Sequence, residues 1–208
     1  MYDKVNIESY VNTESSIPKR NGLLSFWWLM LIVSIPSAVF GVYADITKIA
    51  ILPLVAILSF WIIYLLVNAD SKKMNYILFL GVFSIFISIS FLIAAYKIAV
   101  IEINVSGNYV LLIIFVYFLS IILGILNTFR LIRKGYYKKQ RKIENPIGMI
   151  FASGLFGLGI GRLLLAKISQ DIVVAVLVIG LIFLGFLFSM GTHNLLKYYL
   201  AKKHKCAL

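Results

Sequence analysis

Six blocks of nearly uncharged, mostly apolar residues dominate this chain of 208 residues. Each block holds about 20 residues, which as an α-helix rising 1.5 Å per residue spans the roughly 30 Å hydrocarbon core of a bilayer. The predicted spans cover residues 23–44, 49–67, 75–95, 109–129, 146–166 and 172–192. The sequence therefore predicts an all-α polytopic membrane protein, built as a bundle of six transmembrane helices.

The composition also argues against a separate soluble domain. Hydrophobic residues make up 62% of the chain, and the mean hydropathy is +0.98, well above the level of a soluble domain. We expect a polar N-terminal tail over residues 1–21, one transmembrane domain over residues 22–195, and a basic C-terminal tail over residues 196–208. The two tails are expected in the cytoplasm, the N-terminal one either disordered or lying at the membrane interface.

The basic residues predict the orientation of the bundle. If the chain crosses the membrane six times from a cytoplasmic N-terminus, the basic residues outside the cell are only Lys48, Lys97, Arg162 and Lys167. Sixteen of the 20 Lys and Arg residues then lie inside: Lys4, Lys19, Arg20, Lys72, Lys73, Arg130, Arg133, Lys134, Lys138, Lys139, Arg141, Lys142, Lys197, Lys202, Lys203 and Lys205. Because cytoplasmic loops carry an excess of Lys and Arg, both termini are predicted to be cytoplasmic in a cell membrane. The formal charge of +12 is thus interpreted as a topology signal, and no nucleic-acid partner is expected.

Candidates for catalysis or metal binding are few. The centres of the six spans hold no ionisable residue, which argues against a proton-coupled pump or a voltage sensor. The soft metal ligands are limited to His193, His204 and Cys206, and their spacing matches no zinc site. We therefore expect no metal, no cofactor and no catalytic residues, and we interpret the chain as a protein without enzymatic activity.

Small residues predict where helices pack closely. Ser153, Gly157 and Gly161 recur every four positions in the predicted fifth span, so they share one helical face. In lipid, small residues let helix backbones approach one another. Gly185 and Ser189 in the sixth span are expected to form the opposing surface.

The first span suggests a place for a small-molecule pocket. Pro36 lies near its middle and is expected to kink the helix, with Ser34 and Ser37 beside it. The polar residues of the other spans, mostly serines, are expected to hydrogen-bond to neighbouring helices more often than to line a path.

The segment 130–142 concentrates basic charge in one predicted cytoplasmic loop. Its basic residues are Arg130, Arg133, Lys134, Lys138, Lys139, Arg141 and Lys142, and the loop contains no acid. Each such residue near an anionic inner leaflet contributes about 1 kcal/mol of attraction. The loop is expected to bind lipid headgroups, or alternatively to dock an acidic cytoplasmic partner such as an ATPase subunit.

The stretch Phe151-Ala-Ser-Gly-Leu-Phe-Gly157 resembles the serine motif of the rhomboid intramembrane proteases. That resemblance implies Ser153 as a nucleophile and His193 as its base. The chain departs from the family's pattern, because Phe151 replaces the leading glycine and the His and Asn partners of an earlier span are missing. Intramembrane serine hydrolysis is therefore the remote alternative.

Two functional hypotheses remain ahead of hydrolysis. The first is a non-enzymatic membrane protein that acts through helix or lipid contacts, such as a bacterial immunity protein against a membrane-active toxin or bacteriocin. The second is the membrane subunit of a transporter, a solute-binding or permease component that works with a cytoplasmic ATPase. The first predicts a toxin or another membrane protein as the partner, and the second predicts an ATPase subunit.

Overall fold

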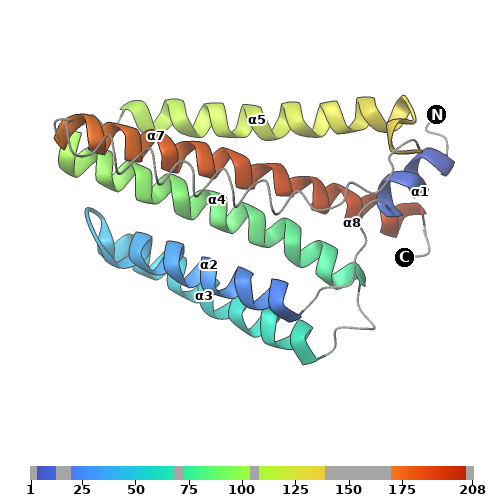
Figure 1. Cartoon of the computed structure of the whole chain (residues 1–208), viewed down its shortest axis with the longest axis horizontal. Helices are drawn as coiled ribbons and strands as arrows, with labels where there is room; N and C mark the ends of the chain where they lie inside the picture. The colour runs from blue at the N-terminus through green and yellow to red at the C-terminus, as the bar shows by residue number, and fades with distance from the viewer. Residues whose placement is uncertain (1–3, 13–19, 68–72, 104–107, 139–169, 205–208) are drawn as a thin grey trace.

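The computed structural model describes residues 4–12, 20–67, 73–103, 108–138 and 170–204, all of whose regular secondary structure is helical (Figure 1). The long helices are α2 (Arg20–Val39), α3 (Ala44–Val67), α4 (Lys73–Ile103), α5 (Asn108–Arg133) and α7 (Gln170–Ser189). A short 3-10 turn, η3 (Met190–Thr192), joins α7 to α8 (His193–His204). Two further short elements are α1 (Lys4–Asn12) and the 3-10 turn η2 (Tyr136–Lys138).

Five of the described helices are long and apolar enough to cross a membrane, namely α2, α3, α4, α5 and the α7–α8 segment. They confirm the predicted helical, multi-pass class and correspond to five of the six predicted spans. The predicted fifth span, 146–166, lies outside the described residues, so the count of six stays a prediction.

Helix α4 occupies the centre of the bundle, with the α2–α3 hairpin on one side and α7 on the other (Figure 1). Its side chains Phe79, Phe83 and Ile87 are almost fully buried and pack with Met30 of α2 and Ile62 of α3. Half of the residues in the apolar 18-residue stretch of α4 are buried. In α5, which lies beyond α7, the corresponding share is 6%. Because α4 is central, it contacts both the α2–α3 hairpin and α7.

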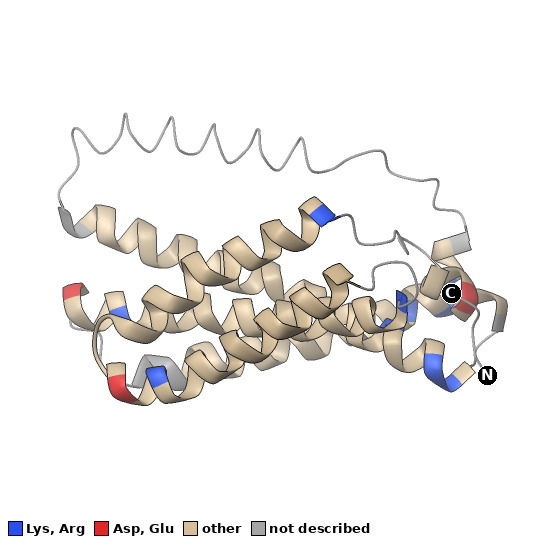
Figure 2. Cartoon of the chain, turned by 90° about the horizontal axis from the view of Figure 1, so that it is seen from below, with Lys and Arg blue, Asp and Glu red and all other residues tan. Residues whose placement is uncertain are grey.

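The bundle has two different ends. At the turn end, α2 meets α3 and α4 finishes. At the opposite end, called the termini end because they are the first and last described helices, α1 and α8 lie side by side (Figure 1). Charged residues of the described part lie toward the ends of the long helices, and the middles of these helices carry none (Figure 2). This distribution is what a hydrocarbon environment requires of the middle section.

Two predicted boundaries at the turn end are corrected by the structure. The expected loop at 45–48 belongs to α3, because the chain turns earlier, at Gly41 and Tyr43, which have positive φ values of 84° and 55°. Asp45 consequently lies in the first turn of α3, where a negative charge complements the helix dipole. Helix α4 runs on to Ile103, although the predicted span ended at residue 95.

Residues 4–12 of the predicted N-terminal tail form the helix α1. Within α1, the side chains of Ile7, Tyr10 and Val11 are at most 2% exposed and pack against Ile132 of α5 and Leu200 of α8. Positions 7, 10 and 11 have the i, i+3, i+4 spacing of one helical face, so a short helix can bury all three. Residues 193–204, most of them predicted to be a tail, form α8 and supply the other side of this contact.

Candidate functional site: an apolar cavity beside a buried lysine

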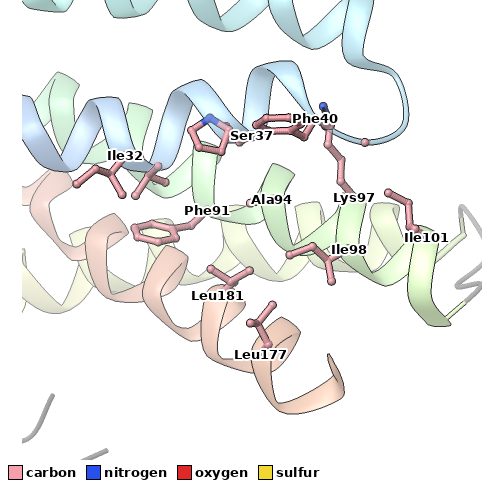
Figure 3. A pocket seen from close by; sticks show the side chains of 13 residues that line it. Ile32, Ser37, Phe40, Phe91, Ala94, Lys97, Ile98, Ile101, Leu177 and Leu181 are labelled. Atoms are coloured by element: carbon pink, nitrogen blue, oxygen red, sulfur yellow. Dashed lines mark hydrogen bonds between the residues drawn. The ribbon is translucent and has the colours of Figure 1, made fainter. Parts of the chain in front are cut away.

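A cavity of about 410 Å³ lies between α2, α4 and α7, toward the turn end (Figure 3). That volume falls within the usual range of small-molecule pockets, roughly 300 to 1,000 Å³. The lining comprises Ile32, Val33, Pro36, Ser37, Phe40, Gly41, Phe91, Ala94, Lys97, Ile98, Ile101, Leu177 and Leu181. Ser37 and Lys97 are the two residues of this lining with polar side chains.

The cavity has a buried floor and an exposed rim. Phe91 of α4 is only 6% exposed, whereas Ile32 of α2 and Phe40 just after that helix are 66% and 69% exposed, and Leu177 of α7 is 48% exposed. Ile32 and Leu177 lie on the flanks of helices long enough to cross a membrane. The cavity is therefore a groove that opens on the side of the helical bundle.

The groove follows the last part of α4. From Phe91 to Ile101 it extends over ten helical steps, or about 15 Å at 1.5 Å per residue. Ile101 lies two residues before the end of α4. The groove therefore covers about the depth of one leaflet's hydrocarbon, which is half of roughly 30 Å.

Lys97 is buried where the groove approaches the turn end. Its side chain is 4% exposed, and its ammonium donates hydrogen bonds of 2.8 Å to the carbonyl oxygen of Phe40 and 2.7 Å to the hydroxyl oxygen of Thr47. In Figure 3 the side chain rises from α4 past Phe40 toward the α2–α3 turn. The stem of Lys97 thus lines the groove, while its charge is held at one end.

The position of Lys97 has a local physical reason. Phe40 directly follows the last residue of α2, where carbonyl groups lack helical partners and the helix dipole is negative. A lysine at that point satisfies a carbonyl and favourably meets the dipole. Lys97 therefore ties the end of α2 to α4.

The charge of Lys97 has no acidic counterpart in the described part of the chain. Its two acceptors are neutral, and the nearby Lys48 acts on it as a like charge. Asp45 makes its ion pair with Lys48 instead, at 3.8 Å, and its side chain is 98% exposed. An ammonium buried among neutral groups is costly, so this end of the groove favours an anion.

The predicted pocket residues divide between the cavity and the core. Pro36 and Ser37 line the cavity, and the Ser37 hydroxyl donates to the carbonyl of Ser34 in its own helix at 2.9 Å. Ser34 is not part of the lining: it is fully buried, and its hydroxyl bonds to that of Ser90 on α4 at 3.0 Å. Ser34 therefore joins α2 to α4.

Two other serines form bonds between helices, as expected, and two do not. The Ser59 hydroxyl accepts from the indole N–H of Trp27 at 3.0 Å, which links α3 to α2. Ser88 donates to the carbonyl of Gly185 at 2.5 Å and so links α4 to α7. In contrast, Ser84 and Ser120 bond to carbonyls of their own helices.

The predicted packing residues are described in part. Gly185 is buried against α4, where an added Cβ would meet Leu92 Cδ2 at 3.0 Å and the carbonyl oxygen of Ser88 at 3.3 Å. Ser189 is buried and donates to the carbonyl of Phe186 in α7 at 2.7 Å. The partner that the structure gives to Gly185 is thus α4. The fifth-span residues Ser153, Gly157 and Gly161 lie outside the described residues.

The basic segment 130–142 begins as a helix, although it was predicted to be a loop throughout. Arg130 and Arg133 form the last turn of α5, where positive charge complements the helix dipole. These two residues and Lys134 are exposed at the termini end. Lys138 belongs to η2, and Lys139, Arg141 and Lys142 lie outside the described residues.

His193 makes hydrogen bonds at the start of α8 through its ring and through its backbone carbonyl. Its Nδ1 lies 2.7 Å from the carbonyl oxygen of Met190, and its own carbonyl accepts a 3.1 Å hydrogen bond from the Tyr10 hydroxyl. Ser153, its proposed catalytic partner, is outside the described residues. In the ranges that the structure describes, no three His, Cys, Asp or Glu residues come together as a metal site.

Sequence reasoning missed Lys97 and Thr47 as a pair. It placed Lys97 in a loop because a charge normally ends an apolar span. The signal that could have found it is the apolar run Ile98 to Ile101 beyond the lysine, which continues the helix. Such a continuation indicates a lysine that is buried in the bundle.

No protein-family model matches this chain, and no curated protein or solved structure is significantly similar to it. The cavity, the buried lysine and the charge distribution are therefore the features on which a functional assignment rests.

Proposed function

We propose that this chain is a non-enzymatic integral protein of the cell membrane that acts by binding a lipid or a helix within the bilayer. The groove between α2, α4 and α7 carries this proposal, because its exposed rim faces the side of the bundle. A recessed apolar surface at that depth meets lipid chains and membrane helices, not water-soluble substrates. Binding within the bilayer is the activity that such a surface supports.

The proposed orientation places the termini end in the cytoplasm. Basic residues of the described chain outnumber acidic ones there, as positive-inside topology requires (Figure 2). Helix α5 finishes at the termini end and α7 begins at the turn end (Figure 1), which supports a sixth crossing at the predicted span 146–166. In this orientation the groove belongs to the outer leaflet.

The first biological form of this proposal is an immunity protein against a membrane-active toxin or bacteriocin. The short connections between α2, α3, α4 and α5 support it, since such a protein needs only an intramembrane contact surface. The test expresses the chain in sensitive bacteria, adds the toxin encoded beside its gene, and follows membrane depolarisation with a potential-sensitive dye. Protection is expected to disappear with Ala94→Phe, which fills the groove, and to persist with Ala50→Phe on the exposed flank of α3. Depolarisation that is unchanged by the chain, for every neighbouring toxin, would contradict an immunity role.

The second form is the membrane subunit of a transporter, which the cavity beside Pro36 and Ser37 favours. The exposed residues Arg130, Arg133 and Lys134 would dock an ATPase on the cytoplasmic side. In that case an ATPase co-purifies with the chain and is lost when these three residues are changed to Glu. Exchanging Lys202 and Lys203 for Glu on α8 gives the control, because both are exposed at the same end. If no ATPase is retained by the wild-type chain, the transporter role is wrong.

A further inference from the structure

We propose that the groove holds one acyl chain of a phospholipid, with the phosphate of that lipid at the Lys97 end. This inference rests on the proposed function and names the ligand class of the same site. Three features of the groove carry it: its length and opening, the chemistry of its walls, and its unmatched charge.

The dimensions of the groove fit a lipid chain lying along the helices. Its length of about 15 Å equals half of the roughly 30 Å hydrocarbon core, which is the depth reached by one leaflet's chains. The rim formed by Ile32, Phe40 and Leu177 is open to the side, so a chain can enter from the leaflet without leaving hydrocarbon.

The walls offer contact surface but few hydrogen-bonding groups. Phe91, Ala94, Ile98 and Leu181 point into the space from α4 and α7 (Figure 3). The Ser37 hydroxyl already donates to the carbonyl of Ser34. A polar solute would lose its hydrogen bonds to water in such a groove, whereas a hydrocarbon chain loses none.

The groove carries positive charge at the turn end, and this would orient a bound lipid. The Lys97 ammonium bonds to two neutral oxygens, and Lys48 adds a second positive charge nearby. Glu102, on the same helix, is exposed and lies five residues later, roughly 140° around the helix. In the described part of the chain no carboxylate pairs with Lys97. A phosphodiester provides the missing negative charge at the level where the groove ends.

The test uses the full chain in lipid nanodiscs and two light-activated probes. One is phosphatidylglycerol with a diazirine in an acyl chain, and the other is a diacylglycerol with the same chain but no phosphate. We expect the first to form adducts on peptides of α2, α4 and α7 that line the groove. Its labelling should exceed that of the diacylglycerol about fivefold, the effect of one favourable lysine contact.

Four variants test the contributions of the acyl chain and of the phosphate separately. Ala94→Phe fills the groove and should reduce labelling by both probes, whereas Ala50→Phe on α3 should leave labelling unchanged. Lys97→Met should reduce the labelling by phosphatidylglycerol to that by diacylglycerol, and Lys97→Arg should keep the difference. The comparison of the two probes on the wild-type chain tests the phosphate even where a Lys97 variant does not fold.

Three results would overturn the proposal. Adducts spread evenly over all helices would contradict an acyl-chain site in the groove. Equal labelling by the two probes would contradict a phosphate contact at Lys97. A change of oligomeric state with Ala94→Phe, without groove-specific adducts, would identify the groove as a protein contact. Each of these results overturns the lipid proposal without deciding the proposed function, which fails in separate experiments, on toxin protection and on ATPase retention.

Discussion

The Lys97 ammonium on α4 donates a 2.7 Å hydrogen bond to the hydroxyl of Thr47 on α3. The same hydroxyl lies 2.8 Å from the carbonyl oxygen of Ala38 near the end of α2, to which it can donate. One polar contact therefore joins three helices at the turn end, beside the mouth of the groove. It fixes the α2–α3 turn on α4 and holds a buried charge beside the groove.

Thr47→Val should weaken this junction, because valine keeps the shape of threonine but cannot accept from Lys97. Hydrogen bonds to charged groups contribute about 1.5–3 kcal/mol, so we expect the free energy of unfolding to fall by about that amount. The measurement is equilibrium unfolding in mixed micelles. Thr47→Ser keeps the hydroxyl and serves as the control. Equal stability of the two variants would show that the hydrogen bond contributes nothing.

Gly185→Leu should separate α7 from α4, because even a Cβ at this position lies 3.0 Å from Leu92. Overpacking of this kind costs about 1–3 kcal/mol, which mixed-micelle unfolding can resolve. Gly180→Leu on the same helix is the matched control, since an added Cβ there meets nothing within 4 Å. If both variants unfold alike, the close approach of α7 to α4 is not a source of stability.

Tyr10→Ala should release α1 from the termini end. The Tyr10 ring packs 4.8 Å from that of Tyr137, centroid to centroid, and the Lys197 ammonium lies 5.4 Å from its centre. Removal of a large buried aromatic side chain costs about 3–5 kcal/mol, which exceeds what a nine-residue helix can recover on its own.

Hydrogen exchange followed by mass spectrometry measures this release. Amide exchange should accelerate in α1 and remain slow in α4. Val5→Ala serves as the control because the Val5 side chain is 54% exposed. Unchanged protection of α1 in Tyr10→Ala would mean that its docking depends on other contacts.

The single cysteine of the chain offers a direct test of orientation. Cys206 should resist a membrane-impermeant maleimide in intact cells and react after lysis, because the C-terminus is predicted to be cytoplasmic. In a Cys206→Ala background, Asp45→Cys should react in intact cells, since position 45 is exposed at the turn end. The opposite pattern would reverse the orientation and place the groove in the inner leaflet.

The coarse architecture could be predicted from the sequence because it depends on local composition. An apolar run such as residues 49–67 must form a helix in lipid, where each backbone polar group needs an internal partner. The positions of the serines similarly indicated bonds between helices, although not which carbonyl or hydroxyl each would reach. Pro36 and Ser37 were predicted to border a pocket, and they do line the cavity, but its other walls on α4 and α7 could not be inferred from them.

The sequence by itself determined the helical class, the presence of helices apolar enough to cross a membrane and the basic character of the termini end. Hydropathy and charge are properties of short segments, and the bilayer acts on them segment by segment. Only the tertiary structure decided that Lys97 is buried beside Thr47, that Gly185 packs against α4, and that α1 docks against α8. These relationships depend on which helices become neighbours and on how each is rotated about its axis. Both are set by the packing of side chains from distant parts of the chain, which no local pattern encodes.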